Sequence, residues 1–292
     1  MTLTTDLLSR CTFPPAGAAV HCAFSGGPDS SALLVLARAA ELTVTAHHVD
    51  HGLRPSSTDE ARQAVEMAGS LGIECIVHHV KVDASRNLEA HARQARQAVL
   101  PDGTLTGHTL DDQAETLLIR LMRGSGSDGL SAISPGPQHP ILRLRRQETV
   151  ALCAEVGISP VIDPTNADPS MWRNRVRHEL LPLLNNIAER DVIPILSRTA
   201  DVLRDDAELL NELAALIDPT DANALCEANP VLAARALRQW LTFDGYPPST
   251  AAIRRVLGVA RGDAIACEID GGIRVARKDR RLRIITPDTS GE

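Results

Sequence analysis

The stretch SGGPDS at residues 25–30 has a composition that suits phosphate binding. Its glycines let backbone N–H groups close around an anion, and a helix that begins at Asp29-Ser30 adds partial positive charge. The hydroxyls of Ser25 and Ser30 can donate to phosphate oxygens. A Walker A loop would require GxxxxGK[ST], and no lysine lies nearby. The stretch therefore predicts a phosphate loop that is not of the kinase or GTPase type.

A second cluster, GHTLDDQAET at residues 107–116, places two carboxylates three residues apart. Asp112 and Glu115 share one face of the predicted helix. Such a pair could bind Mg²⁺ or grip an ammonium group. The alternative is an ordinary acidic first turn, which the helix dipole favours.

Two further polar clusters add histidine, arginine and asparagine. In HHVDHGLR (47–54), His47 and His48 point to opposite faces of a strand, which favours a structural role for His47. We expect nucleotide contacts from the strand end and its surroundings, namely Asp50, His51, Arg54 and His108. Further along, Arg173, Asn174 and Arg177 lie around a helix start, where arginines could offset charge on a phosphate; a solvated basic helix face is the alternative.

The elements that must position these clusters alternate between strand and helix. Apolar runs at 18–24, 42–50, 73–80 and 103–109 read as strands, and amphipathic segments between them read as helices. This alternation predicts an α/β, doubly wound parallel sheet covered on both faces. Ligands of such sheets bind beyond the carboxyl ends of the strands, where the clusters around residues 25–30, 47–54 and 107–116 begin. The GxGxxG match at 124–129 follows a helix instead, so it is not read as a dinucleotide site.

From about residue 186 the chain becomes mainly helical and closes with short strands around a β-hairpin. We therefore predict two domains, 1–185 and 186–292. The net charge of −7 argues against general nucleic-acid binding, but six basic groups against one acid in 271–283 suit a selective polyanion partner. No apolar run approaches the roughly 20 residues that span a bilayer, and no secretory signal is evident, so we expect a cytoplasmic protein.

SGGxDS on a strand–loop–helix resembles the pyrophosphate loop of the N-type ATP pyrophosphatases, also called PP-loop enzymes. Together with VDHGLR, Ala92-Arg93 with Arg96, HTLDDQAET, RGSGSDGLSAI and DPTN followed by RNRVR, it resembles the tRNA(Ile)-lysidine synthetases over about residues 18–184. That family adenylates O2 of the wobble cytidine of CAU-anticodon tRNA(Ile). The amine of free L-lysine then displaces AMP. The resemblance implies ATP and Mg²⁺ as cofactors.

The resemblance also implies roles for individual residues. The loop Ser25, Gly26, Gly27, Pro28, Asp29 and Ser30 would hold ATP, with Asp29 placed to bind Mg²⁺ or position the phosphates. Asp112 and Glu115 would recognise lysine, with Asp112 also catalytic, and Arg177 would lie beside the reacting phosphate. We expect the accessory domain to bind tRNA through Arg274, Arg277 and Arg281. Local contacts around Gln97 and ILRLRRQET (141–149) are not carried over, because the sequence departs from the family pattern there.

Two other functions remain open from the sequence. One is a PP-loop tRNA thiolase, although the six scattered cysteines supply no close pair. The other is a non-catalytic nucleotide-binding module, against which the intact carboxylates argue. The oligomeric state also stays open, with a homodimer among the alternatives.

Overall fold

The computed structural model describes residues 2–50, 52, 57–80, 88–161, 168, 171–243 and 247–285, without the side chains of 88–93. The chain forms two compact units, Met1–Asp201 and Val202–Glu292. The division falls within the long helix α10 (Ile193–Ala215). The sequence boundary at residue 185 lies somewhat earlier, within α9 (Leu181–Ala188).

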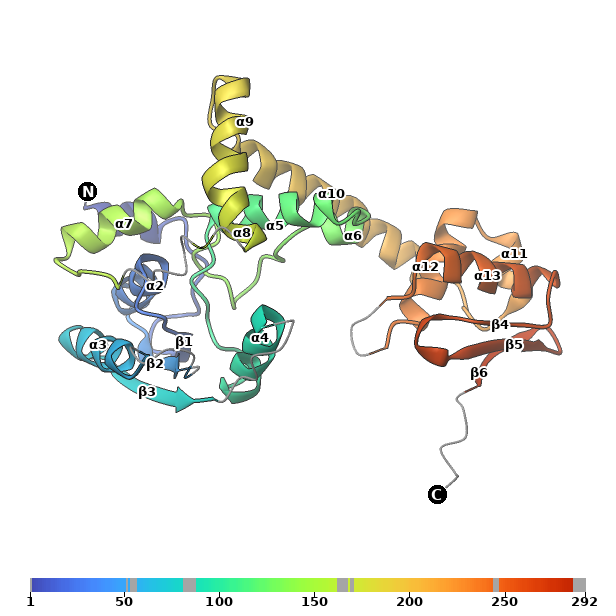
Figure 1. The fold of residues 1–292 in the computed structure, drawn as a ribbon, viewed down its shortest axis with the longest axis horizontal. Helices are drawn as coiled ribbons and strands as arrows, with labels where there is room; N and C mark the ends of the chain where they lie inside the picture. The colour runs from blue at the N-terminus through green and yellow to red at the C-terminus, as the bar shows by residue number, and fades with distance from the viewer. Residues whose placement is uncertain are drawn as a thin grey trace. The chain divides into compact units, whose positions relative to one another are not determined.

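The first unit is built on a parallel sheet (Figure 1). Its strands β1 (Ala19–Ala23), β2 (Thr43–Asp50) and β3 (Glu74–His79) pair in that order. The predicted fourth strand at 103–109 is reduced to one parallel bridge between Leu105 and Cys22. Two hydrogen bonds of 2.8 Å hold it, from Ala23 N to Leu105 O and from Leu105 N to His21 O. Because Leu105 lies on the side of β1 away from β2, the strand order reverses between them, which creates a switch point for ligand binding.

Helices cover one face of this sheet with an apolar core. Alternation along β1 turns Val20 and Cys22 inward and leaves His21 exposed. The inward side chains pack with Ala46 against α2 (Pro28–Ala39) and α3 (Ser57–Ser70), both of which present buried apolar residues. The predicted α/β architecture on a parallel sheet is confirmed.

The remaining elements of the first unit surround this core. They include α1 (Leu3–Leu8), α4 (Leu88–Val99), α5 (Leu110–Met122), α6 (Ser127–Leu130), α7 (Arg146–Glu155), α8 (Trp172–Arg175) and a π-helical turn at Val176–Leu180. Helix α5 begins with a capping box in which Thr109 and Asp112 satisfy each other's backbone N–H groups. Asp112 is therefore fixed at the first turn of α5.

The second unit has its own core. Helices α11 (Ala222–Glu227), α12 (Pro230–Trp240) and α13 (Thr250–Arg261) pack on an antiparallel sheet of β4 (Ala266–Glu268), β5 (Arg274–Lys278) and β6 (Arg281–Ile285). The predicted hairpin is β5–β6, and its turn places Asp279 and Arg280 at positive φ. No helix among the described residues is long and apolar enough to cross a membrane.

Candidate active site

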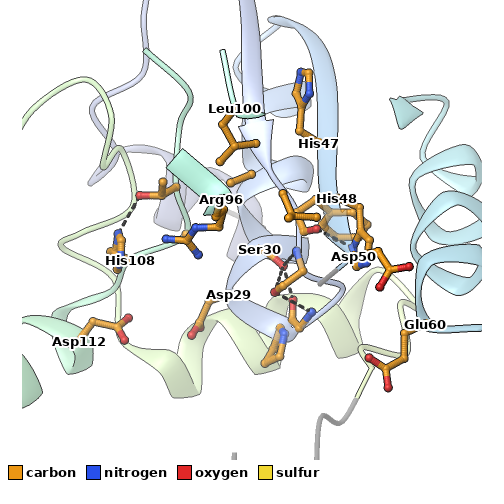
Figure 2. Close-up of a pocket in the computed structure, with 18 of the residues that line it drawn as sticks. Asp29, Ser30, His47, His48, Asp50, Glu60, Arg96, Leu100, His108 and Asp112 are labelled. Carbon is orange, nitrogen blue, oxygen red and sulfur yellow. Dashed lines mark hydrogen bonds between the residues drawn. The ribbon is translucent and has the colours of Figure 1, made fainter. Parts of the chain in front are cut away.

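A cavity of about 490 Å³ opens at the carboxyl ends of β1 and β2 and beside the segment that follows Leu105. In Figure 2, Asp29 and Ser30 lie in its middle, with Asp50 and Glu60 towards one end and His108 and Asp112 towards the other. The cavity thus occupies the switch point of the sheet, where this topology places ligands.

The loop 25–30 is shaped by its glycines and serines. Gly26 has φ of +81°, a conformation that side chains disfavour. The Oγ of Ser30 donates to Gly27 O at 3.0 Å and lies 3.1 Å from the Oγ of Ser25. The loop therefore delivers the N-terminus of α2 to the cavity, with the first N–H groups of the helix available to an anion.

Gly107 lets the segment after Leu105 touch this loop. A Cβ at position 107 would lie 2.9 Å from the carbonyl carbon and oxygen of Asp29 and 3.0 Å from Ser30 N. Only glycine permits this approach, which brings His108 and α5 against the phosphate loop.

Asp29 is held by two donors from α7. Its Oδ2 accepts from Arg146 Nε at 3.0 Å, and its Oδ1 accepts from Thr149 Oγ1 at 2.5 Å. Burial raises the pKa of Asp29 above its usual value, although Arg146 and Thr149 work in the opposite direction. The carboxylate thus depends on its donors to stay ionised.

Arg146 joins three carboxylates at once. Besides Asp29, it donates through Nη2 to Asp112 Oδ1 at 2.9 Å and through Nη1 to Glu115 Oε1 at 2.8 Å. Burial alone would lower its pKa, but these three carboxylates raise it above the usual arginine value. Sequence reasoning missed both Arg146 and Thr149, which lie in the stretch where the sequence departs from the family pattern.

The carboxylate of Glu115 is fully buried and bound by three arginines. Oε1 accepts from Arg146 Nη1 and from Arg177 Nε at 2.7 Å, and Oε2 accepts from Arg173 Nε and Arg177 Nη2, each at 3.1 Å. A carboxylate offers about four acceptor sites, so those of Glu115 are all used. Glu115 is not among the residues that line the cavity, whereas Asp112 and Arg177 are.

Asp112 is ionised in this setting. Burial acts to raise its pKa, but Arg146, Arg173 and the backbone N–H of Thr109 lower it overall. Its Oδ2 is occupied by Thr109, and its Oδ1 lies 2.9 Å from Arg146 and 3.8 Å from Arg177. Of the two carboxylate oxygens of Asp112, Oδ1 is therefore the one that a ligand in the cavity could contact.

Some of the other predicted residues line the cavity, and others lie outside it and bond neighbouring residues. His108 lines it, and burial lowers the pKa of this imidazole to about 4, so it is neutral at neutral pH. Asp50 also lines it and accepts from Gly52 N at 2.9 Å. Arg173 and Asn174 act from outside: Arg173 bonds Glu115 and Thr116, and Asn174 donates to Asp168 O. His51 and Arg54 lie outside the described residues.

Two further residues line the cavity: Arg96, which was not predicted as a site residue, and His47, for which the sequence favoured a structural role. Arg96 of α4 lines it and acts on His108 electrostatically. His47 forms 2.9 Å contacts with His21 and His78 across the three strands, and burial lowers its pKa to about 4. Alternation along strands could have suggested the histidine row, because all three face one side of the sheet.

In the second unit, the strand register separates the arginines of the hairpin. Val275 and Leu282 are buried, and Leu282 pairs across the strands with Arg277, which places Arg277 on the inner face. Arg274 and Arg281 lie on the outer face, with Lys278 and Arg283. Arg281 is bound to Asp218 and Thr220.

Comparisons with known proteins bear on this site. Residues 5–184 match the model of the PP-loop domain. The tRNA(Ile)-lysidine synthase of Rhodococcus erythropolis is 43% identical over 242 residues, 77% of this chain and 74% of the relative. That of Nocardia farcinica is 38% identical over 294 residues, 95% and 92% respectively.

One solved structure has a similar fold at low identity. The U34-tRNA thiolase NcsA from Methanococcus maripaludis, with its [4Fe-4S] cluster, superposes with a TM-score of 0.56 at 18% identity. It covers 69% of this chain and 78% of its own, and shows the fold alone. The sequence relatives are more specific. Because residues 5–184 match the PP-loop domain and these relatives are 38–43% identical over most of the chain, this protein belongs to the family of tRNA(Ile)-lysidine synthases.

Proposed function

We propose that the protein joins lysine to C2 of the wobble cytidine of tRNA(Ile) with a CAU anticodon, at the expense of ATP. The observation that carries this proposal is the meeting of Asp29, Asp112 and Arg177 around one cavity at the end of a PP-loop strand. Mere nucleotide binding would not require a buried carboxylate–arginine network behind the phosphate loop.

The reaction has two half-reactions. In the first, cytidine O2 attacks the α-phosphate of ATP, the bond to the β-phosphate breaks, and pyrophosphate leaves. In the second, the lysine amine attacks C2, loses a proton, and AMP leaves with the former O2. Adenylation is needed because the carbonyl oxygen is a poor leaving group without it.

The residues of the cavity have distinct parts in these steps. The loop 25–30 and the N-terminus of α2 bind the phosphates that become pyrophosphate. Arg177, on the cavity wall beside Asp112, offsets the charge that develops on the α-phosphate. Asp50 lines the opposite end of the cavity, beside the nucleoside part of ATP in this arrangement.

The carboxylates also suit Mg²⁺. Asp29 lines the cavity, and among the described residues each of its carboxylate oxygens accepts one hydrogen bond, which leaves a second acceptor position on each. Magnesium with a nucleotide commonly uses one or two carboxylates and completes its shell with phosphates and water. Asp29 would hold the ion, which supplies charge neutralisation to the phosphates when bound.

For lysine, the geometry favours different roles for the two carboxylates of the predicted pair, Asp112 and Glu115. Asp112 Oδ1 lies on the cavity wall and can receive an ammonium, whereas Glu115 is saturated by arginines. We infer that Asp112 contacts lysine directly and that Glu115 positions Arg146, Arg173 and Arg177.

A thiolase reaction is the second candidate, since the similar fold of NcsA belongs to one. Thiol chemistry favours an exposed, low-pKa cysteine. Here burial raises the pKa of Cys22 to about 12 and that of Cys153 to about 11. Both thiols are therefore protonated at neutral pH and poor nucleophiles.

The test is incubation with CAU-anticodon tRNA(Ile), ATP and isotopically labelled lysine, followed by nucleoside analysis. We expect label in a modified cytidine, with one AMP and one pyrophosphate released for each. A sulfur-containing nucleoside, or ATP binding without pyrophosphate release, would contradict the proposal.

A further inference from the structure

A second cavity, of about 840 Å³, lies in the first unit between the loop before α7, the start of α5 and α10. The described residues that line it include none that line the ATP cavity. It is therefore a separate site, to which neither the reaction nor the family resemblance assigns a role.

The two cavities meet at a wall of three side chains. His108 lines the first cavity and His139 the second, and their Nδ1 atoms are 3.3 Å apart. Each lies 2.7 Å from the Oγ1 of Thr106. His108 belongs to the same end of the first cavity as Asp112, away from Asp50 (Figure 2). The second cavity thus adjoins the end of the first that contains His108 and Asp112.

The lining of the second cavity combines apolar side chains with unpaired positive charge. Leu142 is buried and Leu110 is half-buried, and both line the cavity. Arg143 and Arg198 are exposed, and neither forms an ion pair with any residue that the structure describes. Arg10 is bound to Glu148 at 2.6 Å, and Asp201 is the acidic residue of the lining.

This chemistry fits a nucleotide better than free lysine. A base can pack on apolar surfaces, and planar guanidinium groups bind phosphate oxygens in pairs. An ammonium group would find one carboxylate, Asp201, among several cations. Proteins that read single-stranded RNA loops commonly splay bases out of the stack into such sites.

We propose that this cavity binds a nucleotide of the anticodon loop next to the wobble cytidine, with its phosphate on Arg143 and Arg198. The proposal rests on the proposed function, because it takes the CAU anticodon loop as the substrate. It adds a recognition site that fixes the loop while the wobble base enters the neighbouring cavity.

Binding of a fluorescent anticodon stem–loop RNA, without ATP or lysine, tests the proposal. Gly136→Trp fills the cavity without changing charge, and a Cβ at Gly136 meets no atom within 4 Å and needs no left-handed backbone. The double variant Arg143→Gln with Arg198→Gln removes the cations. Arg190→Gln, an exposed arginine outside the lining, is the matched control.

We expect Gly136→Trp and the double variant each to weaken RNA binding by about tenfold or more, because the first excludes the base and the second removes the cations that bind its phosphate. The double variant should also flatten the salt dependence by about one to two units of slope. An abasic nucleotide beside the wobble position should weaken binding to the wild type but add nothing in Gly136→Trp.

Wild-type RNA affinity in both variants would overturn the proposal. So would a raised KM for lysine with unchanged RNA binding, which would make lysine the occupant. The binding assay needs no catalysis, so failure of the proposed function would appear separately, as an absence of lysidine from the wild type.

Discussion

Arg146 is the residue on which the charges of the site converge. It reaches three carboxylates from α7, although Asp29 belongs to α2 and Asp112 and Glu115 to α5. Lysine could not replace it, because each carboxylate accepts from a different guanidinium nitrogen, and an ammonium has only one nitrogen. We therefore expect it to be as necessary as the carboxylates it joins.

Arg146→Met should lower the rate of pyrophosphate release by about 10²-fold or more. Without its guanidinium, the pKa of Asp29, already raised by burial, rises further. Since the ionised carboxylate is the active form, the acid limb of the pH–rate profile should move to higher pH. Stopped pyrophosphate assays across the pH range measure both effects.

The matched control is Thr149→Val, which removes the hydroxyl that donates to Asp29 and to Arg146 O but keeps the Arg146 guanidinium. It should shift the profile in the same direction by less. Loss of a buried charge partner typically costs about 3–5 kcal/mol of stability, so a thermal melt must accompany the Arg146 data. A folded Arg146→Met enzyme with the wild-type rate and profile would refute this role.

Sequence reasoning found Asp29 and Asp112 but not Arg146, for a physical reason. Asp112 and Glu115 are three residues apart on one helix, so their proximity follows from helix geometry. Arg146 lies 117 residues from Asp29, and only the packing of α7 on α2 brings them together. The spacing of residues in the sequence also could not show that three arginines would bind the carboxylate of Glu115.

At the scale of elements, periodicity predicted the sheet and most of its helices. The fourth strand was the weak point, because its predicted span pairs with β1 only at Leu105. Gly107 and the turn into α5 follow at once, so the chain leaves the sheet to reach the phosphate loop. The site itself thus explains why this strand is short.

The hairpin β5–β6 gives an element-scale prediction about tRNA. Neutralising Arg274, Lys278 and Arg283 on the outer face should weaken tRNA binding and reduce its salt slope by up to about three. Arg277→Gln, on the inner face, should leave the slope unchanged. Titrations of tRNA at several salt concentrations measure this.

If tRNA binding by the triple variant and by the wild type has the same salt slope, the hairpin has a structural role and does not contact tRNA. A large effect of Arg277→Gln alone would instead indicate a fold defect, because its guanidinium lies against the end of α13: a Cβ at Gly262 would be 2.7 Å from its Nη1. Binding of ATP serves as the common control.

At the scale of the whole molecule, the two units have separate hydrophobic cores, one around β1 and α2 and one around α13. Hydrogen exchange should therefore respond to the two substrates in different places. ATP should increase protection in residues 23–31 and 106–115, which contact or support the cavity. It should leave residues 222–285 unchanged, because their amides are stabilised by a core that ATP does not touch.

Full-length tRNA should add protection to the hairpin. Protection of the second unit by ATP alone would show that the units are coupled in a way that their separate cores do not predict.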